Sequence, residues 1–376
     1  MEDRQWYRIE SPGKILSPAL LLYPARIRHN INEMIRLAGD ANRLWPHIKT
    51  HKSADVIRMQ QEAGIDKFKC STLSEAELLG SCGVTEALLA MQPTAVHLNT
   101  YFKIQETYPL TRFSTLVDNR DTLSLMQERT KSKGQRIRLW LDVNNGMDRT
   151  GIAPGPEAIR LVEDLCADPL VDFMGLHVYD GHIRDSDPKA RAERCHREME
   201  PVLNLQRELT SKGLEIRTTI AGGSPSFPIH AKRKEFDLSP GTTLLWDAGY
   251  GQKFPDMPFK HAAVLLTRVI SKPAPGLVCT DLGHKSVASE MPFPRVALLD
   301  SEYCEQVSQS EEHLVLGCGE KKNVGIGELM YALPMHICPT VPKHPSVHIV
   351  EKNRVIGSWS ISALDHNVEI NTDNHA

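Results

Sequence analysis

Residues 45–52 place two histidines and two lysines directly after a short apolar run, so this segment is the first candidate for chemistry. His47 and Lys49 are two residues apart, and in an extended backbone their side chains lie on one face. At the carboxyl end of a barrel strand, burial and nearby cations can lower the pKa of a lysine enough for Schiff-base chemistry. Lys49 is therefore a candidate catalytic residue. The alternative is a surface turn of solvated basic residues.

Further polar residues follow later apolar runs. They are Arg149 in segment 144–151, His177, Tyr179 and His182 in segment 175–182, and Gly222, Gly223 and Ser224 in segment 221–224. Small residues in a turn let backbone N–H groups approach a phosphate, although such a turn is a weak signal by itself. Taken in chain order, an early lysine, a central arginine and a late glycine turn indicate a phosphorylated aldehyde cofactor.

A pair of metal-ligand types lies near the carboxyl terminus. His336 and Cys338 are two residues apart, so on a strand an imidazole and a thiolate could reach one ion. Nitrogen and sulfur ligands favour zinc, and a cysteine does not exclude manganese or cobalt. Two ligands are fewer than the usual three of a catalytic zinc site, so water or a third residue would have to complete the shell. The alternative is a buried cysteine beside a surface histidine.

The elements that must position these residues alternate between short apolar runs and amphipathic stretches. Eight strand–helix repeats predict parallel strands with helical crossovers and hence a (β/α)8 barrel over residues 16–255, with a doubly wound open sheet as the alternative. Ser53, Thr72 and Asn119 are predicted helix caps. The predicted strands are 19–23, 44–48, 67–70, 86–91, 113–117, 137–143, 171–177 and 216–221.

Beyond residue 256 the pattern changes, because short apolar runs follow one another with few helical intervals and frequent proline and glycine. This pattern predicts a second, mainly β domain over residues 256–376. Residues 1–15 are expected to complete it. The second domain would then carry the His336 and Cys338 pair.

Composition excludes several classes of protein. The 376 residues include 44 basic and 47 acidic side chains, giving a formal net charge of -3 and no basic footprint for nucleic acid. No apolar run approaches the roughly 20 residues that span a bilayer, and residues 1–13 do not resemble a signal peptide. The eight cysteines form no CxxC pair, so we expect reduced thiols and a cytoplasmic location.

Five segments together resemble the D-threonine aldolase and D-serine dehydratase family, which are pyridoxal 5′-phosphate enzymes of the alanine-racemase fold. These segments are 46–52, 146–151, 175–182, 221–224 and 336–340, and the resemblance runs from about residue 16 to residue 350. It implies a barrel followed by a β domain, a homodimer with active sites near the subunit interface, and a small D-amino-acid substrate.

The resemblance also implies residue roles. Lys49 would form the Schiff base with the cofactor, Arg149 would contact its phenolic oxygen, and Tyr179 would contact its ring. Gly222, Gly223 and Ser224 would form part of the phosphate cup. His336 and Cys338 would bind a divalent metal, zinc or manganese or a similar ion.

Two departures from the family pattern bear on the reaction. Typical D-threonine aldolases have an aspartate at the place of Cys338, whereas eukaryotic-type D-serine dehydratases have a cysteine. Conversely, residues 179–184 look like a shortened aldolase loop in which His182 would be the base that takes the hydroxyl proton. We therefore expect D-threonine aldolase activity, with D-serine dehydratase activity as the alternative. An amino-acid racemase and a non-catalytic pyridoxal-phosphate-binding protein are further alternatives.

Overall fold

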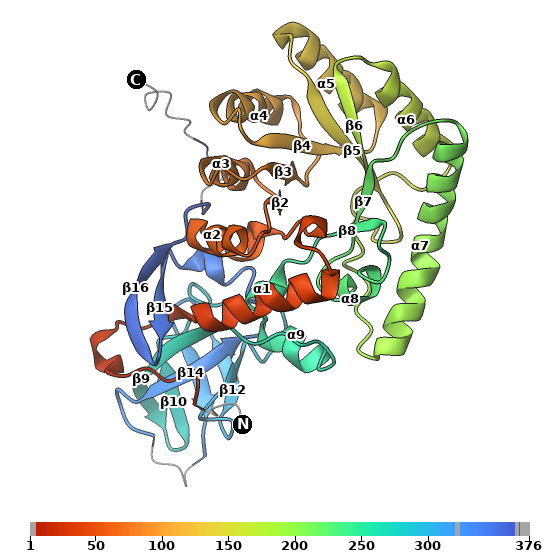
Figure 1. Ribbon diagram of the computed structural model, residues 1–376. Coiled ribbons are helices and arrows are strands. Elements are labelled where there is room, and N and C mark those ends of the chain that lie inside the picture. Colours follow the sequence, from red (N-terminus) through yellow and green to blue (C-terminus); the bar gives the residue numbers. More distant parts are fainter. Residues whose placement is uncertain (1–4, 320–323, 365–367, 369–376) are drawn as a thin grey trace. The chain divides into compact units, whose positions relative to one another are not determined.

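Two β-sheets organise the chain in the computed structural model, which describes residues 5–319, 324–364 and 368 (Figure 1). The residues divide into two compact units. One, here called the sheet unit, comprises Met1–Glu33, Thr50–Asp55 and Thr242–Leu364. The other, here called the barrel unit, comprises Met34–Lys49 and Val56–Gly241. The barrel unit holds a sheet of parallel strands, and the sheet unit holds a second, largely antiparallel sheet.

The barrel unit contains seven parallel strands that pair in chain order. The connecting helices pack against this sheet, so that α3 contacts β2 and β3, and α6 contacts β6. The strands are β2 (Lys67–Cys70), β3 (Glu86–Leu89), β4 (Arg112–Val117), β5 (Ile137–Val143), β6 (Val171–Val178), β7 (Thr218–Ala221) and β8 (Phe236–Leu238). The helices are α2 (Ala54–Glu62), α3 (Leu73–Ser81), α4 (Ala95–Thr107), α5 (Arg120–Lys133), α6 (Pro156–Ala167), α7 (Pro188–Ser211) and α8 (Phe227–His230).

The predicted strand 44–48 occupies the eighth place of the barrel, between β8 and β2, although it pairs only through isolated bridges. Leu44 bridges Leu238 of β8, and His47 bridges Lys69 of β2. The Trp45 N–H donates to the Leu238 carbonyl over 2.8 Å, and the Lys69 N–H donates to the Pro46 carbonyl over 3.0 Å. Pro46 has no N–H to add to this ladder, and the segment turns into the 3-10 helix Ile48–Thr50.

One predicted barrel strand lies elsewhere. Residues 19–23 were expected in the barrel, but β1 (Ala19–Leu22) pairs with strands of the sheet unit instead. All four residues of β1 are buried, and a continuous apolar run fits any strand that is covered on both faces. The barrel place that β1 leaves is taken by the three-residue strand β8, which is too short to show a period in the sequence.

Local signals explain several helix ends. The Thr72 hydroxyl accepts from the Glu75 N–H over 3.1 Å at the start of α3, and Asn119 caps α5 in the same way over 2.8 Å. Both caps were predicted. Ser53 lies at the predicted position directly before α2, but its buried hydroxyl has no hydrogen-bond partner and so makes no capping bond.

Side chains inside the barrel form three levels along its axis. At the amino ends of the strands, a charged ring surrounds a cavity of about 380 Å³; its ionisable members are Lys67, Glu86, Arg112, Arg138, Asp172, Arg217 and Asp237. The next level, here called the apolar layer, consists of Trp45, Leu88, Leu116, Trp140, Met174 and Ile220. At the carboxyl ends of the strands, buried polar side chains replace apolar ones, among them Lys69, Asp142 and His177. The apolar layer thus separates two polar levels, and the buried polar side chains lie at the edge where barrel enzymes hold their sites.

The sheet unit is built around the long strand β9, which pairs with β1, β10 and β14. Its apolar core includes Tyr7, Ile9 and Ile15 together with residues of β1 and β9, so the amino-terminal segment contributes to this core. The strands are β1, β9 (Ala263–Ala274), β10 (Leu277–Thr280), β11 (Val296–Leu298), β12 (Glu305–Gln309), β13 (Leu314–Gly317), β14 (Leu329–Pro334), β15 (Ser346–Glu351) and β16 (Arg354–Ser360). Helix α9 spans Ala248–Lys253, and α1 spans Pro24–Ala38.

Cys304 and Cys318 form a disulfide in the sheet unit, beside β12 and β13. The expectation of reduced thiols throughout is therefore wrong at this pair, because the antiparallel pairing of the two strands brings these cysteines together. The other six cysteines, all within the described residues, form no disulfide. Among the described residues, no helix is both long and apolar enough to cross a membrane.

Candidate active site and metal pair

Lys49 lies in the 3-10 helix Ile48–Thr50, directly after the segment that closes the barrel. Its backbone N–H donates to Nδ1 of His47 over 3.2 Å, so the His47 ring stabilises the turn that carries Lys49. The two side chains were predicted to share one strand face, but the extended backbone ends before Lys49. Lys49 Nζ lies 5.9 Å from the centre of the Tyr179 ring.

Three cationic side chains gather around that tyrosine ring. The guanidinium carbon of Arg149 lies 4.8 Å from the ring centre, and Nζ of Lys69 lies 5.5 Å from it. Lys49, Lys69 and Arg149 are here called the cation group. The structure thus brings together Lys49, Arg149 and Tyr179, which were predicted from the sequence, and adds Lys69, which was not.

No carboxylate forms an ion pair with any member of the cation group within the part of the chain that the structure describes. The nearby carboxylates bind other partners: Asp142 accepts from His177 and Gln92, and Asp180 accepts from His230, Ser226 and Gly223. Three cations without an ion-paired carboxylate fit an anionic group, because bound negative charge would offset their mutual repulsion. The residues present therefore fit a phosphorylated, phenolate-bearing cofactor.

Lys69 ends a buried chain of hydrogen bonds. Nδ1 of His177 lies 2.7 Å from an Asp142 oxygen, and Nε2 of His177 lies 3.4 Å from Lys69 Nζ. Burial, followed by the charge of Lys69, lowers the pKa of His177. Burial opposes ionisation of Asp142, but its interactions with His177, Gln92 and Thr150 together outweigh burial and lower the pKa of this carboxyl. A neutral His177 then donates from Nδ1 to the carboxylate and accepts from Lys69 at Nε2.

Glycine is required at two positions of the turn after β7. Gly222 has φ +81°, and a Cβ there would lie 2.8 Å from Cδ2 of His230. A Cβ on Gly223 would lie 3.0 Å from Cε2 of Tyr179, so this glycine lets the tyrosine ring approach the turn. The Ser224 hydroxyl accepts from the Gly241 N–H over 3.2 Å. The predicted phosphate cup is therefore a tightly packed turn beside the cation group.

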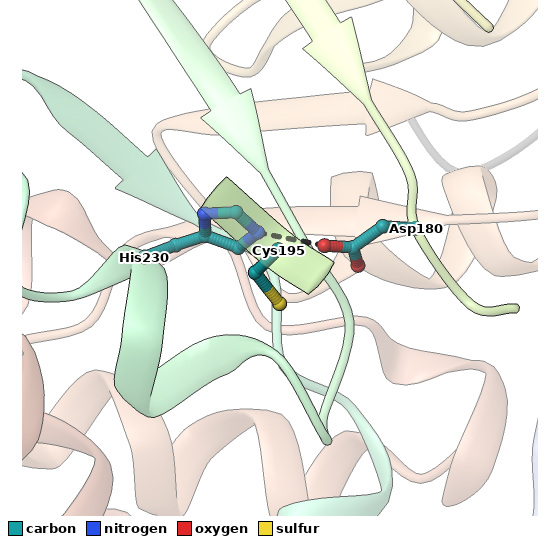
Figure 2. Close-up of side chains that lie close together, drawn as sticks. All are labelled: Asp180, Cys195 and His230. Atoms are coloured by element: carbon teal, nitrogen blue, oxygen red, sulfur yellow. Dashed lines mark hydrogen bonds and ion pairs between the residues drawn. The ribbon is translucent and has the colours of Figure 1, made fainter. Parts of the chain in front are cut away.

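Asp180, Cys195 and His230 form a buried cluster behind this turn (Figure 2). An Asp180 oxygen lies 2.6 Å from Nε2 of His230, and the other accepts from the Ser226 hydroxyl and the Gly223 N–H. The three side chains are types that bind transition metals. However, burial raises the pKa of the Cys195 thiol, and both Asp180 oxygens already accept hydrogen bonds. In this structure the cluster holds the glycine turn in place.

His182 is held by a carboxylate at the start of the loop after β6. Its Nε2 lies 2.5 Å from an oxygen of Glu198 on α7, and Arg194 also donates to Glu198. Nδ1 of His182 is buried and has no hydrogen-bond partner. Among the described residues, no hydrogen bond, ion pair or ring contact joins His182 to Lys49, Arg149 or Tyr179. A predicted base is therefore present and oriented, but outside the group around Tyr179.

The predicted metal pair lies in the sheet unit, in an irregular segment after β14. It was predicted on a strand, but this strand ends at Pro334, and a hydrogen bond rather than the pleat joins His336 to Cys338. Nδ1 of His336 lies 2.5 Å from an oxygen of Glu290. The Ile337 N–H donates to Asp247 over 3.0 Å, which anchors the segment between the two ligand types.

The surroundings of this pair favour a thiolate. Burial opposes ionisation of Cys338, but the hydrogen bond and charge of His336, together with two threonine hydroxyls, outweigh burial and lower the pKa of the thiol. The hydroxyls of Thr50 and Thr242 lie 3.2 and 3.4 Å from its sulfur. For His336, burial is outweighed by Cys338 and Glu290, which raise the pKa to about 9. A thiolate beside an imidazole whose other nitrogen contacts a carboxylate fits a divalent metal.

Comparisons with known proteins agree with the fold. The family model of the alanine racemase N-terminal domain matches residues 23–246, and that of a putative serine dehydratase domain matches residues 262–350. The D-threonine aldolase of an Arthrobacter species is 25% identical over 360 residues, covering 93% of each chain.

Solved structures are similar over the same length. The D-threonine aldolase of Filomicrobium marinum is 26% identical, with a TM-score of 0.86 over 93% of this chain and 95% of that one. The D-threo-3-hydroxyaspartate dehydratase of Delftia sp. HT23 is 20% identical, with a TM-score of 0.78 over 92% and 97% of the two chains.

Proposed function

Because the chain belongs to the family of the alanine racemase N-terminal domain, we propose that it is a lyase that depends on pyridoxal 5′-phosphate and a divalent metal. Its proposed substrates are D-configured β-hydroxy amino acids, and its proposed activity is that of a D-threonine aldolase. The observation that carries this proposal is the cation group around Tyr179, at the carboxyl edge of a parallel barrel. The similarity to two D-threonine aldolases over more than nine-tenths of the chain supports it.

In this proposal the barrel unit holds the cofactor. Lys49 attaches it, Arg149 faces its phenolic oxygen, Tyr179 packs against its ring, and the turn of Gly222, Gly223 and Ser224 receives its phosphate. When bound, the cofactor withdraws electrons from the bond that breaks at the α-carbon of the substrate. The side chains supply attachment and charge, and Gly223 leaves room for the Tyr179 ring.

His182 is the proposed base for the hydroxyl proton. Glu198 holds Nε2 of its imidazole at 2.5 Å, and this contact orients the ring and stabilises the charge that forms when the ring takes up a proton. Nδ1, which is buried without a partner, is the free position. Removal of the hydroxyl proton lets the bond between the α- and β-carbons break, which yields glycine and an aldehyde.

His336 and Cys338 are the proposed metal ligands in the sheet unit, with Glu290 on the other nitrogen of His336. A divalent ion there would act as a Lewis acid on the β-hydroxyl of the substrate. Zinc and manganese are the proposed ions, because an imidazole and a thiolate favour the first and do not exclude the second.

A dehydratase is the second candidate, and Cys338 favours it. Typical D-threonine aldolases of the family that the chain resembles have an aspartate at this place, and residues 262–350 match the putative serine dehydratase domain. A D-threo-3-hydroxyaspartate dehydratase with a cysteine-to-alanine change has been solved in a metal-free form. In this reaction the amine of Lys49 takes the α-proton and hydroxide leaves, so that D-serine yields pyruvate and ammonia.

Product analysis separates the candidates. The purified protein, loaded with pyridoxal phosphate and manganese or zinc, is incubated with D-threonine, D-serine and, as a control, L-threonine. Glycine and acetaldehyde from D-threonine alone support the aldolase. Pyruvate from D-serine without glycine from D-threonine supports the dehydratase, and no product from either D-amino acid contradicts a lyase of this class.

A further inference from the structure

Lys69 is a buried cation that the proposed reaction does not use. It lies on β2, and its exposed fraction is 2%. Removing a charged amine from water is costly unless partners replace its hydration. Its hydrogen-bond partner is the neutral nitrogen of His177, at 3.4 Å, and no described carboxylate forms an ion pair with it. Packing alone therefore does not explain a buried lysine at this position.

The charges that face Lys69 come from several elements. Lys49 and Arg149 repel its ammonium form, while Asp142 and Asp180 attract it. Both carboxylates are already engaged, Asp142 with His177 and Asp180 with His230. Burial, and after it the charge of Lys49, lowers the pKa of Lys69 to about 7. Near neutral pH the amine is therefore close to the midpoint of its titration.

The hydrogen bonds behind Lys69 hold it in place. The carboxamide of Gln92 donates to Asp118 and to Asp142 over 2.8 Å each, Asp142 accepts from His177, and His177 accepts from Lys69. Each link is fixed by the next, so Lys69 Nζ is directed toward the ring of Tyr179 at 5.5 Å. The same ring faces Lys49 and Arg149.

We propose that Lys69 is a second anion-binding lysine of this site, and that it takes up a proton when an anionic ligand binds beside Tyr179. The identity of the ligand, a pyridoxal-phosphate-type anion, rests on the function proposed above. Lys69 forms no covalent bond in this role. Above neutral pH it supplies positive charge when the anion is present and gives up that charge when the site is empty.

Thermodynamic linkage fixes the sign of the effect. Below about pH 7 Lys69 is already protonated in the empty site, so its contribution to ligand binding does not depend on pH. Above that pH the empty site loses the proton while the liganded site keeps it. Binding then takes up as much as one proton, and affinity falls by up to about tenfold per pH unit until the liganded site also titrates.

The test uses 4-deoxypyridoxine 5′-phosphate, which lacks the aldehyde and cannot react with Lys49. Titration calorimetry at several values between pH 6.5 and 9, in buffers of different ionisation enthalpy, gives the affinity and the number of protons taken up. The wild type is compared with Lys69→Arg, which keeps the charge but does not titrate here, and with Lys69→Met, which removes the charge. Lys67→Met is the matched control, because Lys67 lies two residues away on the same strand, in the charged ring, and pairs with Asp237.

We expect the wild type and Lys67→Met to take up more protons above pH 7 than either Lys69 variant does. Lys69→Arg should bind the analogue with an affinity that depends less on pH, and Lys69→Met should bind it more weakly at pH 6.5. Circular dichroism and the thermal midpoint establish that each variant is folded. Equal proton uptake in the wild type and in folded Lys69→Arg would overturn the assignment of Lys69 and leave the proposed function standing. A wild-type protein that binds neither the analogue nor pyridoxal phosphate would overturn both.

Discussion

At the scale of single residues, the Tyr179 ring lies near side chains from distant parts of the barrel sequence. Lys49 follows the segment that closes the barrel, Lys69 lies on β2 and Arg149 follows β5. Each lies within 6 Å of the ring centre. Gly223 is equally close, because a Cβ there would touch the ring. A change at Tyr179 would therefore affect every proposed cofactor contact at once, whereas a change at one cation leaves the others in place.

The first prediction concerns the lysine that attaches the cofactor. Lys49→Ala should abolish the visible absorbance of lysine-bound pyridoxal phosphate and all turnover, because no other amine is proposed to replace it. Lys52→Ala and Lys69→Arg should retain that absorbance. Borohydride reduction followed by peptide mapping checks the site. A reduced adduct at Lys52 or Lys69 in the wild type would contradict the assignment.

His182 carries the second prediction. If it takes the hydroxyl proton, His182→Ala should slow aldehyde release from D-threonine by about 10²–10⁴-fold, the usual range for a general base. Glu198→Gln should cause a smaller loss, since the imidazole remains but loses the carboxylate at 2.5 Å. Cofactor and metal contents, measured by absorbance and elemental analysis, should stay unchanged. Unaltered turnover in His182→Ala would exclude this base.

Sequence reasoning identified residues that lie in motifs and missed the one that does not. Lys49, Arg149, Tyr179 and Gly223 were predicted because each belongs to a polar segment after an apolar run, and the structure places them together. Lys69 belongs to no motif. It alternates with Lys67 in the strand Lys67–Cys70, and two alternating lysines resemble an ordinary exposed strand face. Only the closure of the barrel turns that face inward.

At the scale of elements, irregular segments rather than helices and strands position the residues of the candidate site. The segment that closes the barrel pairs through bridges alone, and Arg43 helps to hold the adjoining chain by donating to the carbonyls of Phe236 and Arg233. The glycine turn is held in turn by Asp180 and Ser226. Neither arrangement has a periodic sequence signal, because both depend on contacts between residues far apart in the chain.

The glycine turn gives the third prediction. Gly222→Ala should lower the thermal midpoint and weaken cofactor binding, because a positive φ costs an L-residue about 1–3 kcal/mol and the new Cβ would collide with His230. Gly213→Ala is the matched control, since Gly213 also has a positive φ, of +75°, but nothing lies within 4 Å of its Cβ position. The thermal midpoint of Gly213→Ala should fall less than that of Gly222→Ala, and its affinity for the cofactor should be unchanged. Equal losses in both variants would mean that strain alone, and not the contact with His230, explains the effect.

At the scale of the whole molecule, the proposed cofactor residues belong to the barrel unit and the proposed metal ligands to the sheet unit. The barrel, the second sheet and their order in the chain were predictable, because strand and helix periods differ along the sequence. The place of β1 was not, since a four-residue buried strand carries no mark of the sheet it joins. The Cys304–Cys318 disulfide was also missed, because no CxxC motif signals it.

The division between units leads to the fourth prediction. Chelation should remove the metal and turnover while pyridoxal phosphate remains attached at Lys49, and added zinc or manganese should restore activity. Cys338→Ala should behave like the chelated protein, whereas Cys338→Asp, which restores a ligand of the aldolase type, should keep metal and activity. Elemental analysis and visible absorbance measure the two occupancies separately. Full turnover in protein shown to be metal-free would remove the catalytic role of the pair.

The fifth prediction is that the protein is a homodimer, as the family resemblance implies. Light scattering coupled to size-exclusion chromatography should give about twice the chain mass of 42.1 kDa. The measurement should be made at several protein concentrations, with and without pyridoxal phosphate. A ligand that favours the dimer raises the population of the dimer by mass action. A mass of one chain under all these conditions would contradict the prediction.

The apolar layer fills the interior of the barrel, so the barrel is not an open channel. Trp45 and Trp140 pack edge to face there, with ring centres 5.6 Å apart, and four aliphatic or thioether side chains complete the layer. A molecule bound at the carboxyl edge therefore cannot pass along the barrel axis to the charged ring on the other side.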